Sequence, residues 1–203
     1  HEIELIKLIS SISSSFINLE PSRVDDGIMQ ALNRIGEFTR YDRMNVYFLS
    51  DGKLVNRYGW KAQGVDTWAG VLHEAETSQF PWWMGKLFRF ESILIPVVDN
   101  LSPEAGPEQA LLRSLSIRSM VAVPLVYNQS LQGFLSLVSV REEKTWREED
   151  VALLSTVADI FANALEHQRV ELELELSKRN LQRSERLAAT GRLAASIAHE
   201  INN

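Results

Sequence analysis

The chain has 203 residues, 45% of them hydrophobic, which is enough for one globular core with a helical extension. Its net charge of -6 at pH 7 argues against nucleic acid and anionic membrane surfaces as partners, because no basic patch outweighs the acidic residues. Cysteine is absent, which excludes disulfides, thiolate metal sites, thiol nucleophiles and thioether-linked chromophores, and which fits a reducing, cytoplasmic location.

The first forty residues predict two helices. The first, over 5–19, has an apolar seam at alternating steps of four and three, as in helices that pack on a partner helix, and Pro21 ends it. The seam consists of Leu5, Ile9, Ile12, Phe16 and Leu19. Ser22 and Asp25 can cap the second helix, whose apolar stripe is expected to cover a sheet. That stripe consists of Val24, Ile28, Ala31, Ile35 and Phe38.

The middle of the chain predicts mainly strands. In chain order, the expected elements are strands 44–49 and 54–58, loops and short helices over 59–90, strand 93–98, helix 108–115, and strands 121–127 and 131–140. The turn residues Ser50, Asp51 and Gly52 join the first two strands into a hairpin.

Segment 119–140 carries no charged residue and has to be weighed as a membrane span. Its middle holds Asn128, Gln129, Ser130, Gln132 and Gly133. Polar and turn-forming residues are least tolerated at the centre of a bilayer, so we interpret the segment as two buried strands and a turn.

A long helix is predicted to begin at the capping-box pattern of Thr145 and Glu148, and if unbroken it would span roughly 85 Å. Its apolar residues follow two heptad phases that cross over at 183–186, a natural place for a two-state switch. One phase consists of Leu174, Leu181 and Ala188, and the other of Leu187, Thr190, Ala194, Ile197 and Ile201.

This order of elements predicts an α+β fold with an antiparallel sheet flanked by helices and with long coiled-coil helices at both ends. The expected organisation is a dimerisation helix over 1–20, a globular domain over 21–144 whose last helix continues to about 166, a coiled-coil helix over 145–186, and a final segment over 187–203. Because the chain begins with His1 and stops at Asn203, both ends are expected to be cut from a longer protein, and a membrane segment before His1 is left open.

Between about Arg23 and Glu166 the chain resembles the GAF family of cytoplasmic sensory domains. The resemblance is carried by 117–125 (IRSMVAVPL), by Gly-Phe-Leu at 133–135 and by Trp-Arg-Glu-Glu-Asp at 146–150. It implies a fold more securely than a ligand.

Residues 187–203 (LAATGRLAASIAHEINN) resemble the first helix of a histidine kinase dimerisation and phosphotransfer domain. The resemblance implies that His199 is the phosphoacceptor, that Glu200 orients the imidazole and acts as base, and that Asn203 positions water for dephosphorylating a response regulator. It also implies an ATP-binding domain of the same protein as a partner, with ATP and Mg bound there. No nucleotide-binding motif occurs in these 203 residues, so the fragment alone is expected to be inactive and to need no cofactor.

The helical pattern supports this interpretation independently. At 100° per residue, His199 lies roughly 160° from the seam that ends at Ile201, on a polar stripe with Arg192 and Ser196. A solvent-facing imidazole is mostly neutral at pH 7 and has a lone pair available to attack phosphorus. An ordinary exposed histidine is the alternative, and a zinc-binding H-E-x-x-H helix is excluded because Asn203 stands where the second histidine would be.

A small-molecule site is predicted only as a candidate. Its possible lining residues are Phe48, Trp60, Trp68, Trp82, Trp83 and Met84, for which a plain hydrophobic core is the simpler explanation. A haem at His73 is disfavoured, since no second motif accompanies it, and no metal or covalently bound bilin is expected.

Two functions remain open on the sequence alone. The first is the sensory and signal-transmitting part of a two-component histidine kinase, acting as a homodimer joined through both helical seams, since neither seam has a cover in its own domain. The second is a GAF-like dimerisation module without a small ligand, which a collapsed pocket would favour over a cavity of a few hundred Å³. A GAF-like methionine sulfoxide reductase is excluded because it would need cysteines.

Overall fold

The computed structural model describes residues 2–39, 41–65 and 73–201, with the backbone alone at 2, 189 and 191–201. Its helices are α1 (Glu2–Ile17), α2 (Val24–Thr39), α3 (Pro81–Leu87), α4 (Gly106–Ser114) and α5 (Glu148–Ile201). Its strands are β1 (Arg43–Ser50), β2 (Lys53–Lys61), β3 (Glu74–Glu76), β4 (Ile93–Ile95), β5 (Ser119–Tyr127) and β6 (Ser130–Ser139). The chain divides into two compact units, one ending at Leu165 and one beginning at Glu166.

The strands form one six-stranded antiparallel sheet in the order β3-β2-β1-β6-β5-β4. Two tight hairpins, β1–β2 and β5–β6, form its four central strands. Both turns use residues with positive φ, namely Asp51 and Gly52 in the first and Asn128 and Gln129 in the second. Turns of that kind match the right-handed twist of paired strands. Both predicted hairpins are therefore confirmed, whereas the three-residue strand β3 was not predicted.

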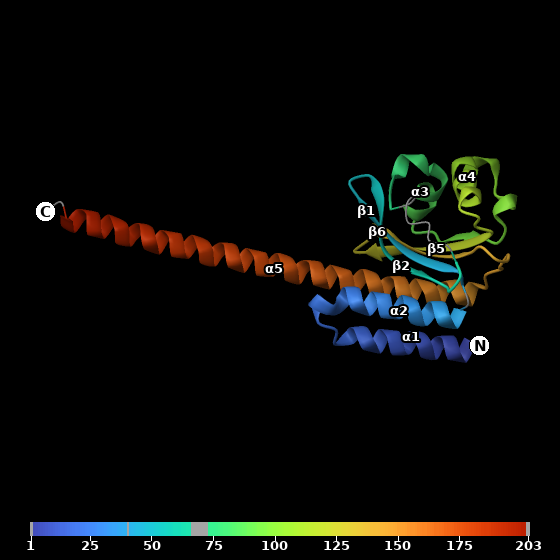
Figure 1. The fold of residues 1–203 in the computed structure, drawn as a ribbon, viewed down its shortest axis with the longest axis horizontal. Coiled ribbons are helices and arrows are strands. Elements are labelled where there is room, and N and C mark those ends of the chain that lie inside the picture. The colour runs from blue at the N-terminus through green and yellow to red at the C-terminus, as the bar shows by residue number, and fades with distance from the viewer. Residues whose placement is uncertain (1, 40, 66–72, 202–203) are drawn as a thin grey trace. The chain divides into compact units, whose positions relative to one another are not determined.

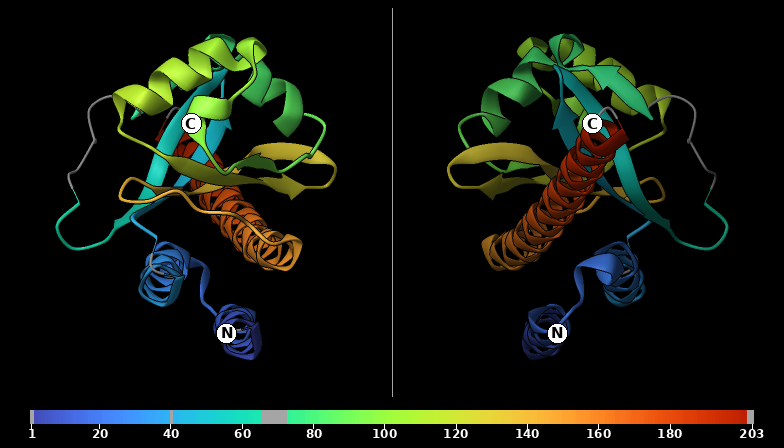
Figure 2. Two further views of the ribbon diagram at one scale, coloured as in Figure 1. Left: turned by 90° about the vertical axis from the view of Figure 1, so that its right-hand side faces the viewer. Right: turned by 90° about the vertical axis from the view of Figure 1, so that its left-hand side faces the viewer.

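Each face of the sheet has its own hydrophobic core. Alternate residues of a strand point to opposite faces, so Met44 and Val46 join one core while Tyr47 joins the other. The first core lies under α1, α2 and the first turns of α5, and the second lies under α3 and α4 (Figure 1). Figure 2 shows the same arrangement of helices and sheet in two further views. The predicted α+β architecture, with an antiparallel sheet between helices, is confirmed.

The seam of α1 is covered by its own chain, which corrects the prediction that it is free to pack on a second chain. Leu5, Ile9 and Ile12 are at most 6% exposed and belong to the first core. The ring of Phe16 lies 5.8 Å from that of Phe161 in α5. The spacing of apolar residues reveals a buried stripe, but it carries no information on which chain covers the stripe.

Helix α5 begins at Glu148, three residues later than the capping-box pattern predicts, and continues without a break to Ile201. In the first unit its inner face is buried, with Val157 and Phe161 fully inaccessible to solvent. In the second unit its large apolar side chains are exposed, including Val170, Leu174 and Leu181 on one face. The predicted long helix is thus confirmed and is continuous through residues 183–186, whereas the crossover of heptad phases there remains a prediction.

Candidate functional site

The first two residues of the predicted phosphoacceptor motif lie in the last turn of α5. His199 and Glu200 have helical backbone, but their side chains lie outside the described part of the chain, as does all of Asn203. Nearby, Leu187 is 66% exposed, and Thr190 is exposed and donates a hydrogen bond from Oγ1 to the carbonyl of Arg186 at 2.9 Å. The roles assigned to His199, Glu200 and Asn203 therefore remain predictions.

The predicted aromatic pocket is divided between the two cores, so its residues do not line a single cavity. Phe48 and Trp60 pack against the core under α1 and α2, and the Trp60 indole donates to Oδ1 of Asn33 at 2.9 Å. Trp83 and Met84 belong to the core under α3 and α4, where Trp82 is half-buried. Trp68 lies outside the described residues.

A small cavity does exist between the sheet and the helices α3 and α4. Its walls include Tyr47, Trp83, Leu112, Met120, Phe134 and Val138. The Tyr47 and Phe134 rings stack with centroids 4.8 Å apart, and the Trp83 ring lies 6.2 Å from that of Phe134. The volume is about 20 Å³, room for one or two water molecules. In this conformation side chains fill the space that a larger ligand would need.

A buried carboxylate lies beside this cavity and was missed by the sequence analysis. Glu108 in α4 is fully buried, and its Oε1 accepts hydrogen bonds from the backbone N–H groups of Trp82 and Trp83 at 2.9 and 3.1 Å. These N–H groups belong to the first turn of α3, where no preceding carbonyl can pair with them. Its Oε2 and the indole nitrogen of Trp83 have no hydrogen-bond partner within the described ranges.

The polar groups on this face would suit a small, mostly apolar ligand with one or two hydrogen-bonding atoms. Tyr47 is 4% exposed, and burial raises the pKa of its hydroxyl, an effect that the nearby Asn56 side chain partly offsets. The hydroxyl is therefore a neutral donor at physiological pH. His73, by contrast, is exposed, and its carbonyl accepts from the N–H of Asn56 at 3.0 Å.

Neither a membrane span nor a metal centre is found in the parts of the chain that the structure describes. None of the helices there is both long and apolar enough to cross a bilayer. The uncharged segment 119–140 is the β5–β6 hairpin instead. No three histidine, aspartate or glutamate side chains in the described ranges come together as metal ligands would.

Comparisons with known proteins place this geometry in a family. The protein-family model of the GAF domain matches residues 25–165 of this sequence. The methanogenesis regulatory histidine kinase FilI of Methanothrix harundinacea (strain 6Ac) is 24% identical over 190 residues, which cover 89% of this chain. The chain spans only about a fifth (21%) of the length of that relative.

Solved structures agree on the fold. The phycocyanobilin-bound GAF domain of a cyanobacterial phytochrome superposes with a TM-score of 0.68 at 16% identity, covering 82% of this chain and 96% of that one. The GAF domain of a phosphoenolpyruvate-protein phosphotransferase from Coxiella burnetii gives 0.64 at 17% identity, with 84% and 98% covered. Because the family model matches more than half of the sequence, this chain belongs to the GAF domain family.

Proposed function

We propose that the chain is the sensory and signal-transmitting part of a two-component histidine kinase. The observation that carries the proposal is the continuity of α5. This helix starts inside the GAF core, where Phe161 is fully buried, and runs unbroken to Ile201, so one element connects the sensory domain to His199. The similarity to a curated histidine kinase supports the same assignment.

In this proposal the chain supplies the nucleophile and another domain supplies the nucleotide. A ring nitrogen of His199 attacks the γ-phosphorus of ATP, the bond to the leaving ADP oxygen breaks, and the phosphoryl group is later transferred to a response regulator. Glu200 orients the imidazole and takes up its proton, and Asn203 positions water for dephosphorylating the regulator. ATP and Mg belong to the ATP-binding domain, and the GAF domain controls through α5 when that domain reaches His199.

The first prediction is that labelling depends on a supplied catalytic domain. The chain incubated alone with γ-labelled ATP should incorporate no phosphate, because its sequence contains no nucleotide-binding motif. Addition of a separate histidine kinase ATP-binding domain should produce a heat- and acid-labile label on the chain, measured after gel separation. Labelling of the chain alone would contradict the proposed division of labour.

We further propose a parallel homodimer, joined by the outer face of α1 and the exposed part of α5. The outer face of α1 lies about 100° around the helix from the buried seam and repeats at steps of three and four. It consists of Ile3, Ile6, Ser10, Ser13 and Ile17. The three isoleucines are 69%, 49% and 74% exposed, and the face carries no charge. A second copy of the same helix is the simplest cover for such a face.

The second prediction tests that face. Ile6→Lys together with Ile17→Lys should weaken dimerisation at least tenfold in analytical ultracentrifugation, since each isoleucine loses about 2 kcal/mol of apolar burial. Glu4→Lys is the matched control, because it changes the net charge by the same amount on nearly the opposite side of α1, and it should leave the dimer intact. A wild-type chain that stays monomeric at tens of micromolar would rule out the dimer itself.

A dimerisation module without a small ligand is the second candidate function, and one observation favours it. The cavity under α3 and α4 holds only about 20 Å³, far below the few hundred Å³ typical of ligand pockets. The phytochrome structure contains a bound bilin, but this chain cannot hold a bilin through a thioether bond, because it has no cysteine. Native mass spectrometry of the purified chain separates the two candidates, since a bound small molecule would exclude the second.

A further inference from the structure

The segment that joins the sheet to α5 is fastened by two side chains that come from the beginnings of other strands. Residues 140–147 connect β6 to α5 and contain no helix or strand. A segment of this kind is held in place only if its backbone groups find specific partners. We call it the junction segment.

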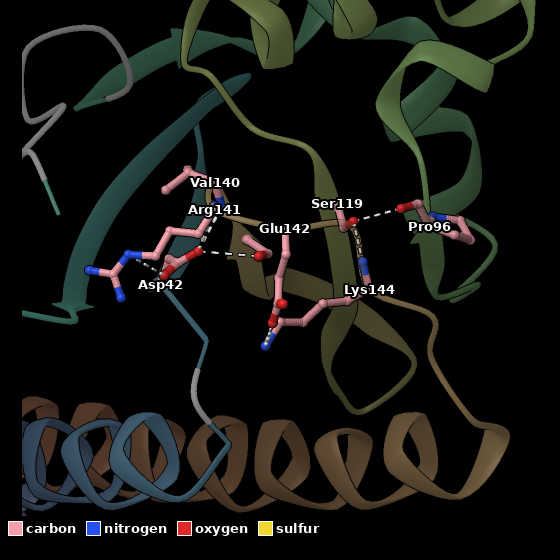
Figure 3. A network of polar contacts seen from close by, with 8 residues as sticks. Asp42, Pro96, Ser119, Val140, Arg141, Glu142 and Lys144 are labelled. Atoms are coloured by element: carbon pink, nitrogen blue, oxygen red, sulfur yellow. Dashed lines mark hydrogen bonds and ion pairs between the residues drawn. The ribbon is translucent and has the colours of Figure 1, made fainter.

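Asp42, immediately before β1, is the first fastening point. Its side chain is 4% exposed, and its Oδ2 accepts hydrogen bonds from the N–H of Val140 at 2.7 Å and from the N–H of Arg141 at 3.1 Å. The hydroxyl of Ser139 also donates to Oδ2 at 3.1 Å, and Nε of Arg141 lies 3.4 Å from Oδ1. One carboxylate therefore holds three consecutive residues (Figure 3). Hydrogen bonds to a charged acceptor are stronger than those between neutral groups.

Ser119, the first residue of β5, is the second fastening point. It is fully buried, and its Oγ accepts a hydrogen bond from the N–H of Lys144 at 2.7 Å while donating one to the carbonyl of Pro96 at 2.6 Å. A single hydroxyl thus connects the junction segment to the residue that follows β4 (Figure 3). Any displacement of the β4 end relative to β5 changes the geometry at the N–H of Lys144.

Tyr41 extends this contact to the beginning of α5. Its ring lies 4.8 Å from that of Trp146, and Nζ of Lys144 lies 4.7 Å from its centroid. Burial raises the pKa of the Tyr41 hydroxyl, and the negative charge of Asp150 in the first turn of α5 raises it further. The neutral phenol therefore stays packed against the segment over the physiological pH range.

Both fastening points connect to the core that surrounds the cavity: Ser119 directly along the chain, and Asp42 through the hydrogen bond that it accepts from Ser139. Ser119 precedes Met120, and Ser139 follows Val138; both Met120 and Val138 line the cavity. Pro96 follows Ile95, which is 1% exposed in the same core. A rearrangement of that core, whether by a ligand or by repacking, acts on the junction segment through at most two hydrogen bonds.

We propose that Asp42 and Ser119 are positioning residues that couple the cavity side of the sheet to α5. Asp42 fixes the end of β6 and the start of the segment, and Ser119 conveys movement of the β4–β5 end to Lys144. The coupling matters for signalling only if α5 controls His199, so this step rests on the proposed function. The two fastening points act on different backbone groups and can be released one at a time.

Residue-resolved amide hydrogen exchange tests the mechanical part. Ser119→Ala should speed exchange of the Lys144 amide at least tenfold and leave exchange of the Val140 and Arg141 amides unchanged. Asp42→Asn should speed exchange of the Val140 and Arg141 amides and leave exchange of the Lys144 amide unchanged. Both variants should also speed exchange in the first two turns of α5. Ser114→Ala is the matched control, because that exposed hydroxyl donates only to a carbonyl of its own helix at 2.7 Å. Asp42→Asn is chosen over Asp42→Ala because it is the milder substitution, so the test can still be made if Asp42→Ala is too unstable to fold.

Phosphoryl labelling with a supplied ATP-binding domain tests the coupling itself. Ser119→Ala leaves two buried backbone groups without a partner, so its midpoint of thermal unfolding should fall, and labelling is measured at a temperature where the variant is still folded. Under that condition Ser119→Ala should change the labelling rate several-fold, and Ser114→Ala should not. Faster exchange at Lys144 with an unchanged labelling rate would overturn the coupling, and unchanged exchange would overturn the fastening. A wild-type chain that is never labelled would refute the proposed function, and the exchange pattern would still decide whether the fastening exists.

Discussion

Gly133→Ala is expected to destabilise the GAF domain by about 3–5 kcal/mol, enough to unfold a large fraction of the molecules. A Cβ at this position would overlap with the carbonyl oxygen of Tyr47 and would lie 3.0 Å from Cα of Phe48. Both atoms are backbone atoms of β1, which pairs with β6 at this point, with Phe48 opposite Gly133. The clash can be relieved only by separating two central strands of the sheet.

Urea unfolding followed by circular dichroism measures this effect. Gly106→Ala is the matched control, because a Cβ there meets no atom within 4 Å, and its cost should stay within about 1 kcal/mol. Equal stability of the two variants would mean that β1 and β6 are not packed as described.

His199→Gln is expected to abolish phosphoryl labelling in the presence of an ATP-binding domain, a loss of at least about a hundredfold, because it removes the attacking nitrogen. Glu200→Gln should slow labelling without unfolding the helix. Asn203→Ala should spare labelling and weaken dephosphorylation of the response regulator. His167→Gln is the control, since His167 is an exposed histidine of the same helix and should have no effect. Label that persists in His199→Gln would refute the phosphoacceptor assignment.

The sequence predicts the larger elements of this fold well, because their signals are local. Both hairpins were found from turn residues whose backbone conformation only a few residue types adopt readily, such as Gly52. The strand β3 was missed because it has only three residues, two of them exposed glutamates, and it forms by pairing with β2. The long α5 was found from its unbroken helical pattern, but its start was placed at Thr145, three residues too early.

The sequence predicts the packing of side chains less well, because that depends on contacts between distant segments. Phe48 was grouped with Trp83, yet the two face different cores. Neighbouring strand residues alternate between faces, and an irregularity in the β1–β2 pairing between Val46 and Tyr47 shifts the register on β2. The buried roles of Glu108 and Asp42 have no signature in sequence, since their partners lie 25 or more residues away.

The most direct test of the central claim, that α5 transmits the state of the GAF domain to His199, is an insertion in α5 between Arg183 and Ser184. One added alanine rotates everything after it by about 100°, whereas seven added residues restore the heptad phase to within about 20°. The labelling rate of His199 with a supplied ATP-binding domain is the measurement. We predict that the single insertion locks labelling at a high or low level and that the seven-residue insertion restores the wild-type rate. Identical labelling rates in all three proteins would contradict transmission through α5.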